Sequence, residues 1–590
     1  MKMKKVMSGN EAIAYGAYLA GIRFGAGYPG TPSTEILENF ARYPGVYAEW
    51  SVNEKVALDV GVGAAYAGRR AIVTMKHVGL NVAADSLFYV SYTGAKAGLV
   101  VVSADDPQMH SSQNEQDNRH YARFAKVPML EPADSEEAKL FIRYAVEISE
   151  TFDTPVIVRT TTRLAHSKAP VRTEEGPPDP GAPAEPAAYE RDPLKYVMVP
   201  AHARLRHPVV EERLKKIAEY AETAPFNFIE EGGGEIGIIT SGVVYQYAKE
   251  VFPGATFLKL GMVYPLPVGL IRELAARVKQ VVVIEELDPF IEEHVRLLGI
   301  PAKGKDIFPN IGEFSPGRIR KHAREAGLLP APQAPAKNGG VSPPALPARP
   351  PMLCPGCAHR GVFYALQRLR TATFGDIGCY TLGAAPPLSA LHTCGCMGAS
   401  IGVVHGVDKV GVKDRTVAVI GDSTFFHSGV APLINLYYNL GTSTVIVLDN
   451  RVTAMTGHQP HPGSGKTLQG KDAPLISVEE VARGIGFKKI DVIDPYDFRN
   501  VVDTIKEHLQ SGEPSVIVAR HPCVLYTRER KPPFAVNLEA CNECGNCLRI
   551  GCSPVVKVEG GVAINAAFCT GCGFCATVCN QKAIYRPAAG

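Results

Sequence analysis

The first 353 residues of this 590-residue chain contain no cysteine, and all fourteen cysteines lie at or beyond Cys354. A disulfide framework would be spread along a secreted chain, so this distribution instead indicates metal ligands in a reducing compartment. An uninterrupted apolar run of about 18 residues is also lacking, so no membrane-spanning helix is expected. The net charge is only +3, so neither nucleic acid nor an anionic membrane is expected as a partner. We expect a cytoplasmic protein, because Asn10 and Glu11 follow the basic start too soon for a secretory signal.

The length predicts three to five domains, and the residue pattern divides the chain into six segments. Three segments alternate apolar strands with amphipathic helices, which is typical of a parallel sheet covered by helices. Proline-rich composition marks a boundary between segments. The segments are 1–175, a linker and helical segment 176–233, 234–328, a proline-rich linker 329–351, 352–534 and a cysteine-rich tail 535–590. The expected strands include 71–73, 98–102, 280–285, 417–421, 445–448 and 515–519, and the expected helices include 54–67, 135–148 and 209–222.

The tail carries two successive cysteine motifs, CxxCxxCx4C and CxxCxxCx3C. A cubane cluster needs four thiolates, and in two-cluster ferredoxins the remote fourth cysteine of each motif ligates the other cluster. Zinc, the alternative metal, prefers paired CxxC units. The motifs therefore predict two [4Fe–4S] clusters. Their predicted ligands are Cys541, Cys544, Cys547 and Cys579 for the first cluster, and Cys569, Cys572, Cys575 and Cys552 for the second.

A second motif lies in 352–534, where polar residues follow two apolar strands. These residues are Gly421, Asp422 and Ser423 after TVAVI, and Asp449 and Asn450 after STVIVL. The pattern resembles the GDG…NN motif of thiamine diphosphate enzymes. A magnesium ion that bridges two phosphates takes oxygen ligands, which Asp422, Asn450 and the backbone carbonyl of Val452 would supply, and glycine lets the diphosphate approach the backbone. By itself, a Gly-Asp pair at a strand end is also an ordinary turn.

Glu54, in SVNEKVAL, precedes a predicted amphipathic helix. Thiamine needs a carboxylate on its aminopyrimidine to favour the imino tautomer, which then deprotonates the thiazolium carbon. Thiamine enzymes place this carboxylate just before such a helix. Taken alone, Glu54 is equally explained as a first-turn glutamate favoured by the helix dipole.

A more specific resemblance rests on seven stretches distributed along the chain. They are GYPGTPSTEI (27–36), EWSVNEKVA (49–57), SADDPQMHSSQNEQDNR (103–119), CPGCAHRG (354–361), GDIGCYTLG (375–383), GDSTFFHSG (421–429) and LDNRVTAMTGHQ (448–459). They resemble the 2-oxoacid:ferredoxin oxidoreductases, and in particular the alpha subunits of the indolepyruvate branch. The resemblance covers nearly the whole chain. It implies a multidomain α/β fold with two thiamine-diphosphate-binding-type parallel-sheet domains, a transketolase-C-like α/β domain between them and a C-terminal ferredoxin-like α+β domain.

The resemblance also assigns residues. Glu54 would be the acid that activates the cofactor, and Thr31 would lie near the substrate carboxylate. Arg123 is matched, in a less similar stretch, to a substrate-binding arginine. Thr31 is also consistent with an ordinary N-cap followed by Pro32 at the first helical position, and both roles can hold together.

Four further cysteines resemble the ligands of a third cluster, which lies beside thiamine in the pyruvate and oxoglutarate enzymes. They are Cys354, Cys357, Cys379 and Cys523. The alternatives are that some are buried thiols or that this cluster is lost. The remaining Cys394 and Cys396 are expected to line the cofactor pocket.

Three positions depart from the family patterns. Ser423 replaces the third glycine of the thiamine motif, and Asp449 replaces its first asparagine. One extra residue precedes Cys552 in the tail, which could shift the potential of the cluster that this cysteine ligates.

The resemblance implies a reaction and partners. The expected reaction is the oxidative decarboxylation of indolepyruvate, phenylpyruvate or hydroxyphenylpyruvate with coenzyme A, the electrons passing through the clusters to an external ferredoxin. A smaller beta subunit would complete an alpha2beta2 heterotetramer. Pyruvate or a branched-chain 2-oxoacid remains an alternative substrate. Two different functions compete with this one: a non-redox thiamine decarboxylase, for which the tail would be superfluous, and an electron-transfer scaffold without catalysis, against which Glu54, Asp422 and Asn450 argue.

Overall fold

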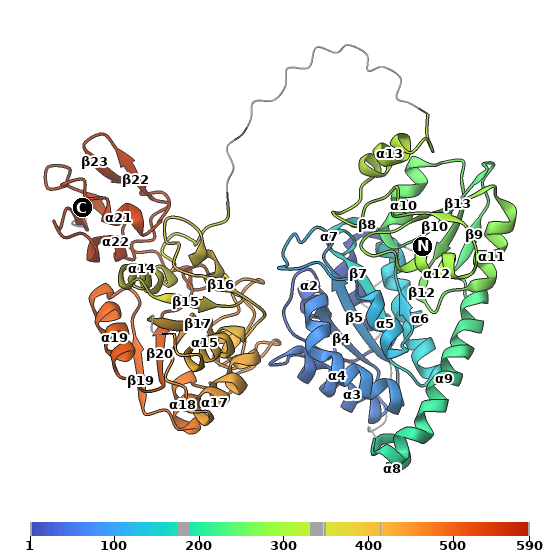
Figure 1. The fold of residues 1–590 in the computed structure, drawn as a ribbon, viewed down its shortest axis with the longest axis horizontal. Helices are drawn as coiled ribbons and strands as arrows, with labels where there is room; N and C mark the ends of the chain where they lie inside the picture. The colour runs from blue at the N-terminus through green and yellow to red at the C-terminus, as the bar shows by residue number, and fades with distance from the viewer. Residues whose placement is uncertain (1–2, 174–188, 331–345, 347–349, 413–414, 588–590) are drawn as a thin grey trace, which may run out of the picture. The chain divides into compact units, whose positions relative to one another are not determined.

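A computed structural model describes residues 3–173, 189–330, 346, 350–412 and 415–587. The chain divides into two compact units, Met1–Val341 (unit 1) and Ser342–Gly590 (unit 2), whose elements are labelled in Figure 1. Most of the proline-rich linker predicted at 329–351 lies outside the described residues. Among the helices that are described, none combines the length and the apolarity needed to span a membrane.

Unit 1 is built on a seven-stranded sheet in the order β12-β6-β7-β5-β4-β2-β3, in which only the β12–β6 pair is antiparallel. Its strands are β2 (Phe24–Gly27), β3 (Tyr47–Trp50), β4 (Ala71–Lys76), β5 (Leu99–Asp105), β6 (Met129–Leu130), β7 (Val156–Thr161) and β12 (Met262–Tyr264). The central strands β4 and β5 are buried along their whole length, as their continuous apolar sequence predicts. A separate antiparallel pair joins β1 (Met3–Ser8) to β8 (Lys168–Thr173).

Helices follow the strands of this sheet, as in other parallel α/β folds. The helices α3 and α4 pack on each other and share one hydrophobic core with alternate residues of the strands, such as Val73 and Val101. A second group is formed by α1, α2 and α6. The bounds are α1 (Gly9–Leu19), α2 (Thr34–Phe40), α3 (Glu54–Tyr66), α4 (His77–Thr93), α5 (Arg119–Ala125), α6 (Ser135–Phe152) and α7 (Thr162–His166). The predicted helices at 54–67 and 135–148 are therefore confirmed, the second being four residues longer.

The second layer of unit 1 is a five-stranded sheet in the order β14-β13-β10-β11-β9. Its strands are β9 (Phe228–Glu230), β10 (Ile236–Ser241), β11 (Thr256–Leu260), β13 (Gln280–Ile284) and β14 (Ala302–Lys303), and its helices are α10 (Gly242–Val251), α11 (Val268–Arg277), α12 (Phe290–Leu297) and α13 (Pro316–Glu325). A short helix α8 (Pro193–Tyr196) precedes the long helix α9 (Pro200–Thr223). The prediction that this helix spans 209–222 was too short, because the helix continues through Pro208 and begins with Pro200 in its first turn, where a missing N–H costs nothing.

Buried ion pairs join the two sheets of unit 1. Arg119 at the start of α5 donates to Glu285, which follows β13. Arg159 on β7 donates to Glu131, and Glu131 also accepts from a hydroxyl on β10. The neighbouring Glu286 has no ion-pair partner among the described residues, and burial raises its pKa to about 7. The interface between the two sheets is therefore held by charge as well as by apolar packing.

Unit 2 is built on a fully parallel six-stranded sheet in the order β16-β15-β17-β18-β20-β19. Its strands are β15 (Ala372–Gly375), β16 (Thr393–Cys394), β17 (Thr416–Gly421), β18 (Thr444–Asp449), β19 (Lys489–Ile493) and β20 (Ser515–Arg520). Its helices are α14 (His359–Leu369), α15 (Ala399–Lys409), α16 (Asp422–Thr424), α17 (Val430–Tyr438), α18 (Val478–Ile485), α19 (Phe498–Gln510) and α20 (Val524–Thr527). The strands predicted at 417–421, 445–448 and 515–519 are confirmed.

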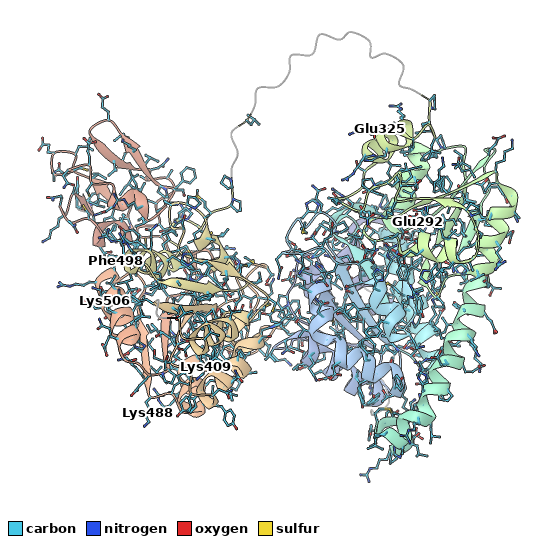
Figure 2. The ribbon with its side chains drawn as sticks, in the orientation of Figure 1. Glu292, Glu325, Lys409, Lys488, Phe498 and Lys506 are labelled. Carbon is cyan, nitrogen blue, oxygen red and sulfur yellow. The ribbon has the colours of Figure 1, made fainter. Side chains whose placement is uncertain are left out.

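The cysteine-rich tail folds on the same unit and contains two antiparallel pairs, β21 with β24 and β22 with β23. Its elements are β21 (Ala535–Val536), α21 (Asn546–Arg549), β22 (Val555–Val558), β23 (Gly561–Ile564), α22 (Phe574–Thr577) and β24 (Ile584–Tyr585). An aromatic cluster fastens it to the sheet domain: the ring of Phe574 lies 6.1 Å from Phe498 on α19 and 6.5 Å from Tyr364 on α14. Phe498 is labelled in Figure 2. The predicted α/β fold with a C-terminal α+β tail is confirmed.

Candidate functional site

The carboxyl ends of adjacent parallel strands meet at one edge of the unit 1 sheet, where the candidates Thr31 and Glu54 lie together with two further charged residues. Thr31 follows β2, Glu54 follows β3 and begins α3, and Lys76 ends β4. Asp106 follows β5. Because β3, β2, β4 and β5 are consecutive in the sheet, these residues form one polar cluster at the strand ends.

Glu54 is buried, with 5% of its surface exposed, although its side chain is polar. Asn53 caps the helix by accepting the N–H of Val56 at 2.9 Å, which fixes Glu54 in the first turn. A Cβ on Gly79 would lie 2.5 Å from Glu54 Oε1, so only glycine leaves room for this carboxylate against the first turn of α4. The helix-dipole interpretation of Glu54 therefore describes its position, but does not account for its burial.

Thr31 is half-buried, and its carbonyl accepts the Ser111 hydroxyl at 3.2 Å. The interpretation of Thr31 as an N-cap with Pro32 at the first helical position is wrong, because α2 begins only at Thr34 after Ser33 and the Thr31–Pro32 peptide is cis. Arg123 lies exposed on α5. Its charge acts on Tyr264 and His294, which lie outside the polar cluster, so its substrate-binding role stays a prediction.

Asp422 is the centre of a second polar cluster, at the carboxyl edge of the unit 2 sheet. It follows β17 and is 3% exposed. One oxygen accepts the Ser423 N–H at 2.8 Å, and the other accepts the Arg451 N–H at 2.7 Å and His461 Nε2 at 3.1 Å. Burial acts to raise the pKa of Asp422, but His461 and the two backbone donors hold it below its ordinary value, so the carboxylate is charged.

The segment after β18 lies against Asp422. The Asn450 side-chain oxygen accepts the N–H of Val452 at 3.1 Å, and Thr453 donates to the Ser423 hydroxyl at 2.8 Å. A carboxylate and an amide side chain thus lie at the ends of adjacent strands, with the backbone of Val452 next to them. Carboxylate, amide and backbone carbonyl oxygens are hard donors that suit magnesium. The Ser423 hydroxyl anchors this segment, which gives the serine a role that glycine could not fill.

Gly421 and Asp449 have structural explanations of their own. A Cβ on Gly421 would lie 2.8 Å from the Tyr380 ring, so glycine is required here by packing. The Asp449 carboxylate accepts Arg520 Nε at 2.6 Å, and Arg520 also donates to Glu479. Burial and the nearby Asp422 raise the pKa of Asp449. Asp449 therefore anchors the strand end, while Asn450 is the residue that offers a free oxygen lone pair.

The cysteines matched to a third cluster gather beside Asp422. Burial, with a contribution from nearby Cys379 and Cys354, raises the pKa of Cys357 to about 12. Burial, together with the nearby Cys523, Cys354 and Asp422, likewise raises the pKa of Cys379 to about 11. Mutual electrostatic influence of this kind requires that the four thiols be close neighbours. Moreover, the Cys523 N–H donates to the Asn450 carbonyl at 3.0 Å, which joins this group to the Asp422 cluster.

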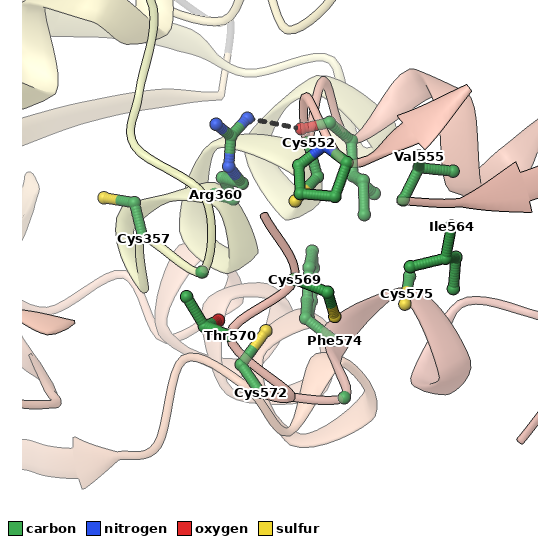
Figure 3. A pocket seen from close by; sticks show the side chains of 14 residues that line it. Cys357, Arg360, Cys552, Val555, Ile564, Cys569, Thr570, Cys572, Phe574 and Cys575 are labelled. Atoms are coloured by element: carbon green, nitrogen blue, oxygen red, sulfur yellow. Dashed lines mark hydrogen bonds between the residues drawn. The ribbon is translucent and has the colours of Figure 1, made fainter. Parts of the chain in front are cut away.

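Two cavities in the described part of the tail are each lined by one complete set of four cysteines. The larger, of about 420 Å³ when its opening to solvent is included, is lined by Cys569, Cys572, Cys575 and the remote Cys552. Figure 3 shows these side chains around the cavity. Cys357 also lines it, but Figure 3 shows the sulfur of Cys357 pointing away from the cavity.

The smaller cavity, of about 340 Å³ when its opening to solvent is included, is lined by three cysteines of the first motif and the last cysteine of the second. Its four cysteines are Cys541, Cys544, Cys547 and the remote Cys579. This exchange of the fourth cysteine between motifs is the arrangement of two-cluster ferredoxins.

The spacing of the cysteines argues against zinc. Four sulfurs around one zinc ion lie about 3.8 Å apart, given Zn–S bonds of about 2.3 Å. Within the part of the chain that the structure describes, the only three metal-ligating side chains with ligand atoms within 4.8 Å of one another are Asp117, His120 and Asp288. No three of the described cysteines meet this distance limit, so the four sulfurs of each set lie farther apart than the ligands of a single zinc ion. This wider spacing fits a cubane cluster.

Arg360, which the sequence patterns did not single out, joins the sheet domain to the tail. It lies in the first turn of α14 and is 3% exposed. Its guanidinium donates to the Ile550 carbonyl at 3.0 Å and to the Gly551 carbonyl, and Figure 3 shows it reaching the tail beside Cys552. It also donates to the carbonyls of Leu353 and, at 3.2 Å, Cys354. One side chain thus ties the CPGC loop to the residues just before Cys552.

Two more residues were missed by the sequence analysis. Asp376 follows β15 and accepts the Ser400 hydroxyl at 2.8 Å and the Gly398 N–H at 3.1 Å, which fixes the loop that carries Cys379. His461 positions Asp422. Asp376 lies in the GDIGC stretch, so the sequence marked its motif, but the sequence did not indicate that its side chain fixes this loop. Cys394 and Cys396 are both exposed, and whether they line a cofactor pocket stays a prediction.

Comparisons with known proteins agree with this geometry. Residues 15–225 match the family "Pyruvate flavodoxin/ferredoxin oxidoreductase, thiamine diP-bdg". Residues 376–519 match the family "Thiamine pyrophosphate enzyme, C-terminal TPP binding domain". The two polar clusters described above therefore lie in two thiamine diphosphate-binding domains.

Curated relatives match over nearly the whole chain. The indolepyruvate oxidoreductase subunit IorA of Archaeoglobus fulgidus is 41% identical over 99% of this chain and 98% of its own. The IorA subunit of Pyrococcus horikoshii is 41% identical over 98% of this chain and 96% of its own. The 2-oxoglutarate synthase subunit KorA of Methanothermobacter thermautotrophicus is 25% identical over 47% of this chain and 86% of its own. The chain therefore belongs to the IorA branch of the 2-oxoacid:ferredoxin oxidoreductases, which oxidise 2-oxoacids with thiamine diphosphate.

Proposed function

We propose that the chain oxidatively decarboxylates aryl 2-oxoacids, namely indolepyruvate, phenylpyruvate and hydroxyphenylpyruvate. The 2-oxoacid and coenzyme A would give the aryl-acetyl-CoA, carbon dioxide, one proton and two electrons. The observation that carries the proposal is the pair of tail cavities, each lined by four cysteines, together with a third thiol group beside Asp422. The names of the IorA relatives support the substrate class.

The residues of the two polar clusters have distinct tasks in this proposal. Thiamine diphosphate, when bound, supplies the nucleophilic carbon and the electron sink for decarboxylation. Asp422, Asn450 and the Val452 carbonyl would hold the magnesium ion that binds the diphosphate. The buried Glu54 carboxylate would hold the proton on the aminopyrimidine ring nitrogen.

The cysteine groups form a series that suits stepwise electron transfer. The third group begins beside Asp422, and its Cys357 also lines the larger tail cavity. In the tail, Cys547 of the smaller cavity contributes to the raised pKa of Cys575 in the larger one, so these two groups are neighbours as well. Electrons would pass from the third cluster through the two tail clusters to an external ferredoxin.

The proposal includes a partner. The IorA relatives are named as subunits, and the chain would pair with a smaller beta subunit in an alpha2beta2 heterotetramer. Coenzyme A would enter as co-substrate.

The test is anaerobic co-expression with the small subunit, followed by viologen reduction with coenzyme A and a panel of aryl, branched-chain and small 2-oxoacids. We expect the aryl substrates to give the highest kcat/KM. Glu54→Gln should abolish turnover while the clusters remain intact. Reduction only with pyruvate or a branched-chain 2-oxoacid would contradict the aryl assignment, and full activity of Glu54→Gln would contradict the role of that carboxylate.

A further inference from the structure

Lys76 is a buried lysine that has no ion-pair partner among the described residues. It is the last residue of β4 and is 7% exposed. No carboxylate of the described residues lies within 4.0 Å of its ammonium group; Nζ instead donates to the Ser111 carbonyl at 2.8 Å and to the Ser111 hydroxyl at 3.3 Å. Burial lowers the pKa of Lys76 to about 8. Lysine is rarely buried unless it is paired with an anion. We therefore expect the ammonium group of Lys76 to bind an anionic ligand.

The nearby carboxylate of Asp106 already accepts hydrogen bonds from other groups. Asp106 follows β5 and influences Lys76 electrostatically. Its carboxylate, however, accepts the Ser111 N–H at 2.8 Å, the Ser112 hydroxyl at 2.6 Å and the Thr162 hydroxyl at 2.6 Å. An ammonium group has three donors, and the two contacts to Ser111 leave one for another acceptor.

Lys76 lies among the residues of the unit 1 cluster. Its Cβ would be 3.0 Å from a Cβ on Gly30, the residue before Thr31. Ser111 contacts both residues, since it accepts from Lys76 and donates to the Thr31 carbonyl. One turn beyond Lys76, Gly79 packs on the Glu54 carboxylate. The ammonium group therefore lies at the same strand edge as the proposed catalytic carboxylate.

We infer that Lys76 binds the carboxylate of the 2-oxoacid substrate, an assignment that rests on the proposed function. Of the anions that the reaction needs, the cofactor diphosphate is assigned to the magnesium ligands of unit 2. The phosphates of coenzyme A and the substrate carboxylate remain. Of these, only the carboxylate adjoins the reacting carbonyl carbon, which the proposed function places at the cofactor that Glu54 activates. A lysine point charge with one open donor suits a single carboxylate oxygen.

The experiment uses the holoenzyme with its small subunit and phenylpyruvate as the probe. Loss of one charge-assisted hydrogen bond should raise the KM for phenylpyruvate about thirty-fold in Lys76→Met, with the KM for coenzyme A and the thiamine and iron contents unchanged. Lys76→Arg, which keeps the charge, should recover most of this loss. Lys168→Met, an exposed lysine on β8, is the matched control and should behave as the wild type.

Lys76→Gln removes the charge but keeps an N–H donor on a side chain one atom shorter, and it carries the test if Lys76→Met does not fold. An unchanged KM for phenylpyruvate in these variants would overturn the inference. So would a rise in the KM for coenzyme A instead, or loss of thiamine, because either would assign the charge to another ligand. A wild-type enzyme inactive with every 2-oxoacid would overturn the proposed function, whereas an active wild type with an indifferent Lys76 overturns only this inference.

Discussion

Replacing Arg360 by methionine should release the tail from the sheet domain. Methionine keeps the apolar stem but removes the guanidinium, which donates to four backbone carbonyls, those of Ile550, Gly551, Leu353 and Cys354. Hydrogen bonds from a charged donor contribute about 1.5–3 kcal/mol each, and desolvation of an unpaired guanidinium offsets part of the sum. We expect a net loss of about 3–5 kcal/mol, at the upper end of single-site effects.

The assay is anaerobic urea titration followed by cluster absorbance, with iron content measured before and after. A loss of this size lowers the midpoint by about 1–3 M, given a typical urea dependence for a domain of this kind. Arg368→Met is the matched control, because Arg368 is exposed on the same helix. Equal midpoints for the two variants would refute the assignment of Arg360 as the clamp between the CPGC loop and the tail.

Three further predictions concern charge and metal content. Burial raises the pKa of Glu286 to about 7, above its unfolded value, so unit 1 loses stability as pH rises from about 4.5 to 7; Glu286→Gln should stabilise it by about 2–3 kcal/mol near pH 8 and little near pH 5. Fluorescence of Trp50, the chain's one tryptophan, checks this in unit 1, and equal gains at both pH values would contradict it. Cys552→Ser should lower bound iron by about four per chain, whereas Cys394→Ser should not, and iron analysis decides. Asp422→Asn should raise the magnesium concentration needed for half-maximal activity at least about tenfold; an unaltered magnesium titration would count against the predicted ligand.

The fold was predictable where one local signal dominated. Continuous apolar strands such as β4 and β17 and the amphipathic helix α6 follow from hydrophobic periodicity alone. Periodicity failed at α9, because its first half carries Pro208 and few apolar residues and is held by packing against α4. The start of α2 was also misplaced, since Thr31-Pro32 has the sequence of a helix start but a cis peptide.

Part of the candidate site was likewise predictable from a local sequence pattern, and part was not. Cysteine spacing predicts which four thiols share each tail cavity, because the geometry of a cubane restricts the sequence pattern. Residues that act through contacts with distant parts of the chain could not be predicted from the sequence. Arg360 binds carbonyls 190 residues away, and His461 reaches Asp422 across 39 residues. Lys76 is an ordinary strand residue until its burial, and the absence of an ion-pair partner in the part of the chain that the structure describes, are known.

In the proposed function, electrons taken from a 2-oxoacid leave through the cysteine-bound clusters. Freeze-quench electron paramagnetic resonance tests it most directly, on the anaerobic holoenzyme mixed with phenylpyruvate and coenzyme A in the absence of an acceptor. We predict signals of reduced [4Fe–4S] clusters within the turnover time, in the wild type but not in Glu54→Gln. Clusters that dithionite reduces but that stay oxidised with every 2-oxoacid would contradict the account.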